Sequence, residues 1–200
     1  MSLELRVGAL VTGSYFPKNG RIMPETAQQY IQRILSHVEG QDAIKMQRTT
    51  APRLAKLIRG LTPRDLKWQP APGKWSIAEI VAHLADVEIV ASWRMRSVLG
   101  SNGTAIQPFD QDAWASVFEY RNRKAKQSLE VFRALRHNNL AMLKALPRES
   151  WDNFGMHAER GKETIAHLAR MFAGHDANHI LQVEAIVAQL RSARRKKKRK

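Results

Sequence analysis

The sequence predicts an all-α protein, a four-helix bundle with one extra helix at its N-terminal side. Three observations support this fold class. Apolar residues recur at spacings of three, four and seven in four long segments of the 200-residue chain, which is the period of an amphipathic helix. We find no convincing strand, no repeat of fixed period and no Gly-rich phosphate loop. Two long connections separate the segments, so the bundle is not expected to be a simple up-and-down series.

Length and composition are those of one domain flanked by two shorter parts. With 44% hydrophobic residues, the chain can bury a substantial core. Residues 1–22 contain scattered glycines and no sustained period, so they are expected to form a loosely ordered extension. Residues 23–190 should form the bundle, and residues 191–200 a basic, disordered tail.

The first two helical segments precede residue 61. Pro24 is favourable in a first turn, and the apolar stripe that follows it ends near Gly40, which defines the extra helix. Pro52 opens the next segment, which stops around Gly60. Residues 41–50 could also be helical, but Pro52 predicts a break or a kink after them. A connection rich in Pro and Gly follows.

A long helix is expected at residues 76–100. Ser76 and Glu79 form a capping box at its start. At 100° per residue, His83 lies about 60° from the centre of the apolar stripe, at the edge of the buried face. Glu79 and Asp86 flank His83 by about one turn. The His83 ring is therefore expected either to pair with one of these carboxylates or to be a third metal ligand that they orient.

Two further helices complete the bundle, and both connections before them contain features of interest. Asp110 is a suitable N-cap for a short helix within the first connection. His157 lies in the second, which is expected to be an irregular loop close to the functional site. The segments in order are the connection 101–123, the helix 124–146, the connection 147–163 and the helix 164–190.

The candidate functional site lies in the last helix. His175 and His179 occupy positions of the apolar stripe where a bundle helix normally carries Leu or Ile, and their spacing of four projects both rings from one face. Such a pair either forms hydrogen bonds inside the core or holds a metal ion, and spacing alone leaves both interpretations open. Asp176 lies about 40° from the stripe. We expect its carboxylate to form a salt bridge or to contact a metal-binding side chain. The alternative is that Asp176 acts as a general base.

Composition excludes several classes of function. Without cysteine, the chain has no disulfide, thiolate ligand or Cys nucleophile, so a metal must be held by His, Asp or Glu. No apolar run approaches 18 residues, which predicts no membrane span, and the N-terminus is a poor secretion signal, so the cytoplasm is the default location.

The net charge of +15 is concentrated at the C-terminus. The ten residues from Arg191 to Lys200 carry eight basic groups and no acid. Such a tail suits contact with phosphate, for example in nucleic acid, without readout of its sequence. The rest of the chain lacks the interleaved aromatic and basic pattern of a dedicated nucleic-acid-binding protein.

Four stretches resemble the DinB-like superfamily. Residues 73–88 and 174–179 are similar to its signature segments, and residues 108–114 and 157–161 also resemble its members. The resemblance extends over about residues 25–190. It implies a four-helix bundle with the order up-down-down-up, which is often dimeric.

The resemblance also implies a metal and a chemistry. Members hold a divalent ion, of zinc or nickel type, on three histidines that match His83, His175 and His179. Characterised relatives include thiol-dependent S-transferases and an isomerase, and others are described as metal-dependent hydrolases. Three hypotheses follow. Two of them involve a small-molecule substrate: the metal activates a low-molecular-weight thiol, or it hydrolyses small esters or amides. The third is a non-catalytic, stress-associated bundle with a structural metal and a tail that contacts nucleic acid.

Overall fold

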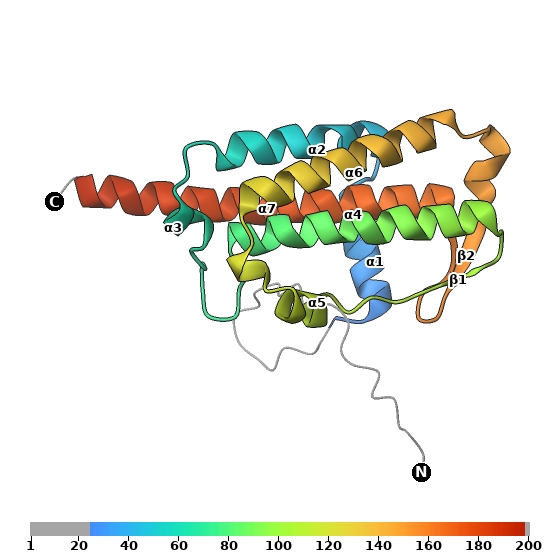
Figure 1. Cartoon of the computed structure of the whole chain (residues 1–200), viewed down its shortest axis with the longest axis horizontal. Helices are drawn as coiled ribbons and strands as arrows, with labels where there is room; N and C mark the ends of the chain where they lie inside the picture. The colour runs from blue at the N-terminus through green and yellow to red at the C-terminus, as the bar shows by residue number, and fades with distance from the viewer. Residues whose placement is uncertain (1–24, 199–200) are drawn as a thin grey trace, which may run out of the picture.

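Four long amphipathic segments form four packed helices in the computed structural model, which describes residues 25–198 (Figure 1). Residues 1–22, expected to be a loosely ordered extension, lie outside the described residues. Each long helix can bury its apolar stripe only against its neighbours, so the four share a core. They are α2 (Ala43–Ile58), α4 (Ile77–Gly100), α6 (Ala125–Ala145) and α7 (Ile165–Lys198).

The four helices follow the order up-down-down-up. Figure 1 shows α2 and α7 running in one direction and α4 and α6 in the other. Helix α4 packs against α6 and α7, and α2 packs against the same two helices, so the parallel pair α4 and α6 are neighbours. The connection between them must therefore return along the bundle, and it carries the short helix α5 (Gln111–Val117). The predicted all-α bundle is confirmed.

Side-chain caps fix where the helices begin. The extra helix α1 (Ala27–Ser36) packs against α7 from outside the bundle. The predicted capping box of α4 is present, because the Ser76 hydroxyl accepts from the Glu79 N–H at 3.3 Å and the Glu79 carboxylate accepts from the Ser76 N–H at 2.8 Å. The expected cap of α5 is also present, with Asp110 accepting from two backbone N–H groups. Shorter helical turns are α3 (Pro63–Leu66), η1 (Tyr120–Asn122) and η2 (Arg148–Asp152).

Helix α2 continues through Pro52, so the predicted break there is wrong. Proline inside a helix removes one backbone hydrogen bond and costs about 3 kcal/mol. Pro52 itself is exposed, whereas Ala51, Leu54 and Ile58 on the opposite side are buried in the core. Burial of that face against α6 and α7 offsets the local cost.

Three short strands lie where the sequence predicted only irregular connections. They are β1 (Ala105–Ile106), β2 (Phe154–His157) and β3 (Gly161–Thr164), and β2 pairs antiparallel with β3 and parallel with β1. Strands of two to four residues are too short for an alternating pattern to identify them. Gly155 allows the close pairing, since a Cβ there would lie 2.5 Å from Cγ1 of Ile106. The sheet places His157 on β2 and not in a loop.

Helix α7 extends to Lys198, so residues 191–198 are helical and not disordered as expected. Arg and Lys are good helix formers, and a helix adds one hydrogen bond for each further residue once it has formed. Arg194 also forms an ion pair with Asp65 of α3. Among the helices of residues 25–198, none is long and apolar enough to cross a bilayer.

Two apolar clusters fill the bundle, and a layer of buried polar side chains separates them. Arg136 of α6 lies at the centre of this layer and donates to Glu88 at 2.7 Å and to Asp176 at 2.5 Å. Asn139 donates to Glu88 and Thr50 donates to Asp176, which gives each carboxylate a further hydrogen bond. Members of the first cluster include Leu84, Phe132 and Ile180, and those of the second include Met95, Leu143 and Leu168.

The contact between α1 and α7 depends on Gly174. A Cβ at this position would lie 2.1 Å from the backbone oxygen of Ile34. We expect Gly174→Ala to lower the free energy of unfolding by about 1–3 kcal/mol, as overpacking does, when measured by urea denaturation. Gly100→Ala is the matched control, since a Cβ at Gly100 meets nothing within 4 Å. Equal effects of the two substitutions would contradict this packing.

Candidate metal centre

Three histidines from two helices converge at one point of the bundle. Nε2 of His175 lies 3.1 Å from Nε2 of His83 and 3.1 Å from Nε2 of His179. All three side chains are buried, and their candidate ligand atoms lie within 4.8 Å of one another. The convergence follows from the fold, because α4 packs directly on α7 and the two α7 histidines are one turn apart. The predicted cluster is therefore present.

Aromatic side chains hold the imidazole rings in place. The ring of Trp75 lies with its centroid 4.8 Å from that of His83, and it stacks on His179 at 6.4 Å. Phe109, from the connection before α5, stacks on the other side of His83 at 6.4 Å. Trp75, in the connection before α4, therefore forms a wall of the site.

One nitrogen serves two contacts in the cluster of rings. Nδ1 of His179 lies 2.9 Å from Oε1 of Gln182, so it carries the proton and leaves Nε2 with a lone pair. Nε2 of His175 faces Nε2 of both other rings, but a neutral imidazole nitrogen has either one hydrogen or one lone pair. At most one of the two contacts can therefore be a linear hydrogen bond in the absence of a cation. Nitrogen atoms 3.1 Å apart fit ligands at about 2.1 Å from one shared ion.

The protonation state of the rings also suits a metal. Burial lowers the pKa of His83 and of His175 well below the ordinary value, and neighbouring histidines lower both further. Burial lowers the pKa of His179 to about 4. The three imidazoles are thus neutral near pH 7, which is the form that binds a metal ion.

These lowered pKa values predict how the stability of the metal-free protein depends on pH. Above pH 6.5 the histidines are neutral in both the folded and the unfolded state, whereas below it the unfolded chain binds protons that the folded state excludes. The free energy of unfolding should therefore fall as the pH is lowered from 7 to 5. Urea denaturation of chelator-treated protein measures this, and His175→Gln should show a smaller fall. A constant free energy over this range would contradict the assignment.

The acidic partners expected for His83 are engaged elsewhere, so that prediction is wrong. The Glu79 carboxylate accepts from Ser76 at the helix start, and Asp86 forms an ion pair with Arg123 at 2.8 Å. A carboxylate binds the N–H groups of a helix start, or a permanently charged arginine, more strongly than it binds a neutral imidazole. Among the described residues, the buried Nδ1 atoms of His83 and His175 have no hydrogen-bond partner.

Asp176 forms the salt bridge that was expected of it. Its carboxylate accepts from Arg136 and from the Thr50 hydroxyl at 2.9 Å, inside the polar layer. It lines neither of the two cavities described below. The sequence did not identify Arg136, because an arginine on an amphipathic helix is normally interpreted as exposed.

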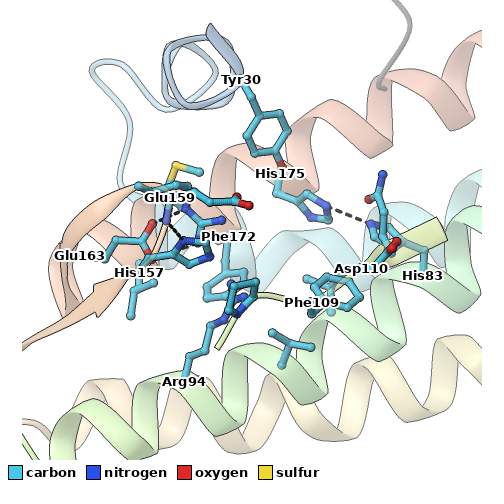
Figure 2. A pocket seen from close by; sticks show the side chains of 17 residues that line it. Tyr30, His83, Arg94, Phe109, Asp110, His157, Glu159, Glu163, Phe172 and His175 are labelled. Atoms are coloured by element: carbon cyan, nitrogen blue, oxygen red, sulfur yellow. Dashed lines mark hydrogen bonds and ion pairs between the residues drawn. The ribbon is translucent and has the colours of Figure 1, made fainter. Parts of the chain in front are cut away.

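Two cavities open onto the histidines. The smaller, with a volume of about 150 Å³, is lined by His83 and His175 and extends towards β2 and β3 (Figure 2). The larger, of about 340 Å³, is lined by His175 and His179 and extends between α7, α1 and the connection before α4. His175 and Tyr30 line both. A ligand in either cavity can therefore reach the triad.

The fold and the site together define the class of protein. It is a helical bundle in which three converging histidines, next to two cavities, form a candidate metal centre. The family model of the DinB superfamily matches residues 47–183, a range that includes all three histidines. The chain belongs to the DinB superfamily.

Relatives with curated names agree with this assignment. A protein of Oceanobacillus iheyensis, named as a candidate metal-dependent hydrolase, is 25% identical over 136 residues, which cover 68% of this chain and 78% of that protein. YfiT of Bacillus subtilis, named in the same way, is 23% identical over 66% of this chain and 74% of its own. The solved structure of YfiT, described as a four-helix bundle of unusual topology, matches 89% of this chain and 94% of its own with a TM-score of 0.70 at 19% identity.

Proposed function

We propose that the protein is a metal-dependent hydrolase of small esters or amides, with His83, His175 and His179 as the metal ligands. The observation that carries the proposal is the convergence of three neutral, buried Nε2 atoms at the junction of two cavities. The names of the curated relatives support hydrolysis as the reaction type. A divalent ion with three nitrogen ligands and an open position lowers the pKa of a bound water or thiol and so supplies a nucleophile near neutral pH.

The residues around the triad have supporting roles in this proposal. Trp75 and Phe109 restrict the rotation of the imidazoles and exclude bulk water from them. Gln182 accepts the Nδ1 proton of His179 and so directs the lone pair of Nε2 into the site. The two cavities hold the substrate, with the bond to be cleaved next to His175, the histidine that lines both.

Transfer of a low-molecular-weight thiol is a second candidate, and one observation favours it. The two cavities meet at His175, which gives a thiol and an electrophile separate spaces on either side of the triad. The chain has no cysteine, so the sulfur has to come from a second substrate. A hydrolase uses water and needs only one of these spaces for an organic substrate.

A comparison of two assays separates the candidates. Zinc- and nickel-loaded protein is incubated with p-nitrophenyl acetate, and separately with a small thiol and 1-chloro-2,4-dinitrobenzene. Hydrolysis that requires the metal and is absent from the variant with alanine at all three histidines supports the first proposal. Thiol-dependent consumption of the electrophile with the same requirement supports the second. If neither rate exceeds that of the triple variant, the centre is not catalytic towards these substrate classes, and the proposal is wrong.

A further inference from the structure

We propose that the smaller cavity is a pocket for an anionic group, in which Arg94 and His157 bind the carboxylate of a small organic acid beside the triad. The inference rests on the proposed function only in assigning this acid as part of the substrate. Its physical basis is independent of the metal. Two side chains that line one cavity each contain a buried N–H group that has no acceptor among the described residues.

Arg94 is a buried cation without a carboxylate partner. Its side chain extends from α4 and is only 7% exposed, and Nη2 donates to the backbone oxygen of Gln107 at 2.7 Å. The buried Nε atom has no hydrogen-bond partner, and no acid of the described residues lies within ion-pair distance of the guanidinium. Glu163 acts on this charge only from beyond ion-pair distance. Burial of a charge without a hydrogen-bonded partner is costly, so a guanidinium in this position favours an anion supplied by a ligand.

His157 supplies the second donor. It lies on β2 and is 3% exposed, and its Nδ1 accepts from the backbone N–H of Glu159 at 3.2 Å. A neutral imidazole whose Nδ1 accepts must carry its proton on Nε2. That Nε2 is buried without a partner and is therefore a free donor. Burial, followed by the nearby positive charge of Arg160, lowers the pKa of His157 to about 4, which keeps the ring neutral.

The other charged groups that line the cavity have partners of their own or contact solvent. Arg160 is held by Glu163 through hydrogen bonds of 2.6 and 3.0 Å, so these two charges compensate each other. Glu159 is an exposed wall residue in contact with solvent. Asp110, also exposed, accepts from the first N–H groups of α5. Figure 2 shows Arg94 rising from α4 towards the space that His157 lines, with His175 and His83 further along the cavity.

The size and walls of the cavity define the class of acid. Its volume of about 150 Å³ is below the range of about 300–1,000 Å³ that is typical of sites for larger ligands. Leu168, Met171 and Phe172 line it between the two donors and the histidines. A planar carboxylate with a short apolar chain satisfies both the charge-assisted donors and these walls. The reacting group at the other end of that chain would then lie beside His83 and His175.

Binding of butyrate tests the pocket without any measurement of activity. Isothermal titration calorimetry is performed on the wild type and on Arg94→Met, in both zinc-loaded and chelator-treated protein. We expect butyrate to bind to the wild type in both states, and Arg94→Met to weaken it about 10- to 100-fold, as the loss of a hydrogen bond to a charged group does. Butyramide, the neutral isostere, should bind poorly. Arg33→Met is the matched control, because Arg33 lines the larger cavity.

A second measurement uses the unmodified protein, in case Arg94→Met does not fold. The Nε–H resonance of Arg94 in a ¹⁵N spectrum should shift on addition of butyrate but not of butyramide. Four results would overturn the proposal: equal binding of acid and amide, binding that is lost on removal of zinc but not in Arg94→Met, preference for inorganic phosphate, or no shift of the Arg94 resonance. A failure of the proposed hydrolysis leaves these results unaffected, since they report binding to chelator-treated protein.

Discussion

The variant His175→Ala is expected to lose its bound metal and with it any metal-dependent activity. Nε2 of His175 is the atom that contacts both other ligands, at 3.1 Å each, so its removal leaves two nitrogens from different helices. We expect the affinity for zinc to fall by more than about 100-fold, beyond the loss caused by removing a residue that only orients a ligand. Elemental analysis and competitive zinc titration measure the change.

His167→Ala is the matched control for this prediction. His167 lies on the same helix, is partly exposed, and lies 3.9 Å from Glu163 and away from the cluster. Its replacement should leave the metal content unchanged. If His175→Ala retained one equivalent of tightly bound zinc, the triad would not be the metal centre.

The largest effect on stability is expected from Arg136→Met. The arginine is 4% exposed and lies between two buried carboxylates, Glu88 at 2.7 Å and Asp176 at 2.5 Å. Without it, two negative charges remain buried and repel each other, which should lower the free energy of unfolding by about 3–5 kcal/mol. Urea denaturation at pH 7 measures the difference.

Two further variants identify the cause. Arg133→Met removes an arginine from the same helix that pairs with Glu130 at the surface, and it should cost no more than about 1 kcal/mol. Combining Arg136→Met with Glu88→Gln and Asp176→Asn removes the buried charges and should recover part of the lost stability. A cost for Arg136→Met equal to that of Arg133→Met would show that the polar layer does not stabilise the fold.

The fold was predictable because its determinants are local. Apolar periodicity identified the four bundle helices, and the Ser76–Glu79 capping box located the start of α4 correctly. The histidine cluster was predictable for a related reason, since His175 and His179 lie on the buried stripe of one helix. Helix geometry left the role of His83 open between pairing with a carboxylate and ligating a metal, and the resemblance to the superfamily decided for the ligand, because no spacing within one helix relates it to the other two.

The features that sequence reasoning missed depend on tertiary contacts. The roles of Arg94 and Arg136 cannot be predicted from a helical pattern, because a charged residue is normally assigned to the surface. The strand containing His157 pairs with the neighbouring β3 and also with β1, which lies far earlier in the chain. Pro52 is tolerated only because the helix around it is packed. The expected dimer, and contact of residues 191–200 with nucleic acid, stay predictions.

Anomalous diffraction from crystals of zinc-loaded protein, recorded at the zinc absorption edge, tests the central claim most directly. The account predicts one strong peak per chain, about 2.1 Å from Nε2 of each of His83, His175 and His179. A zinc ion bound elsewhere, or a crystal with no zinc peak between these three nitrogens, would contradict it.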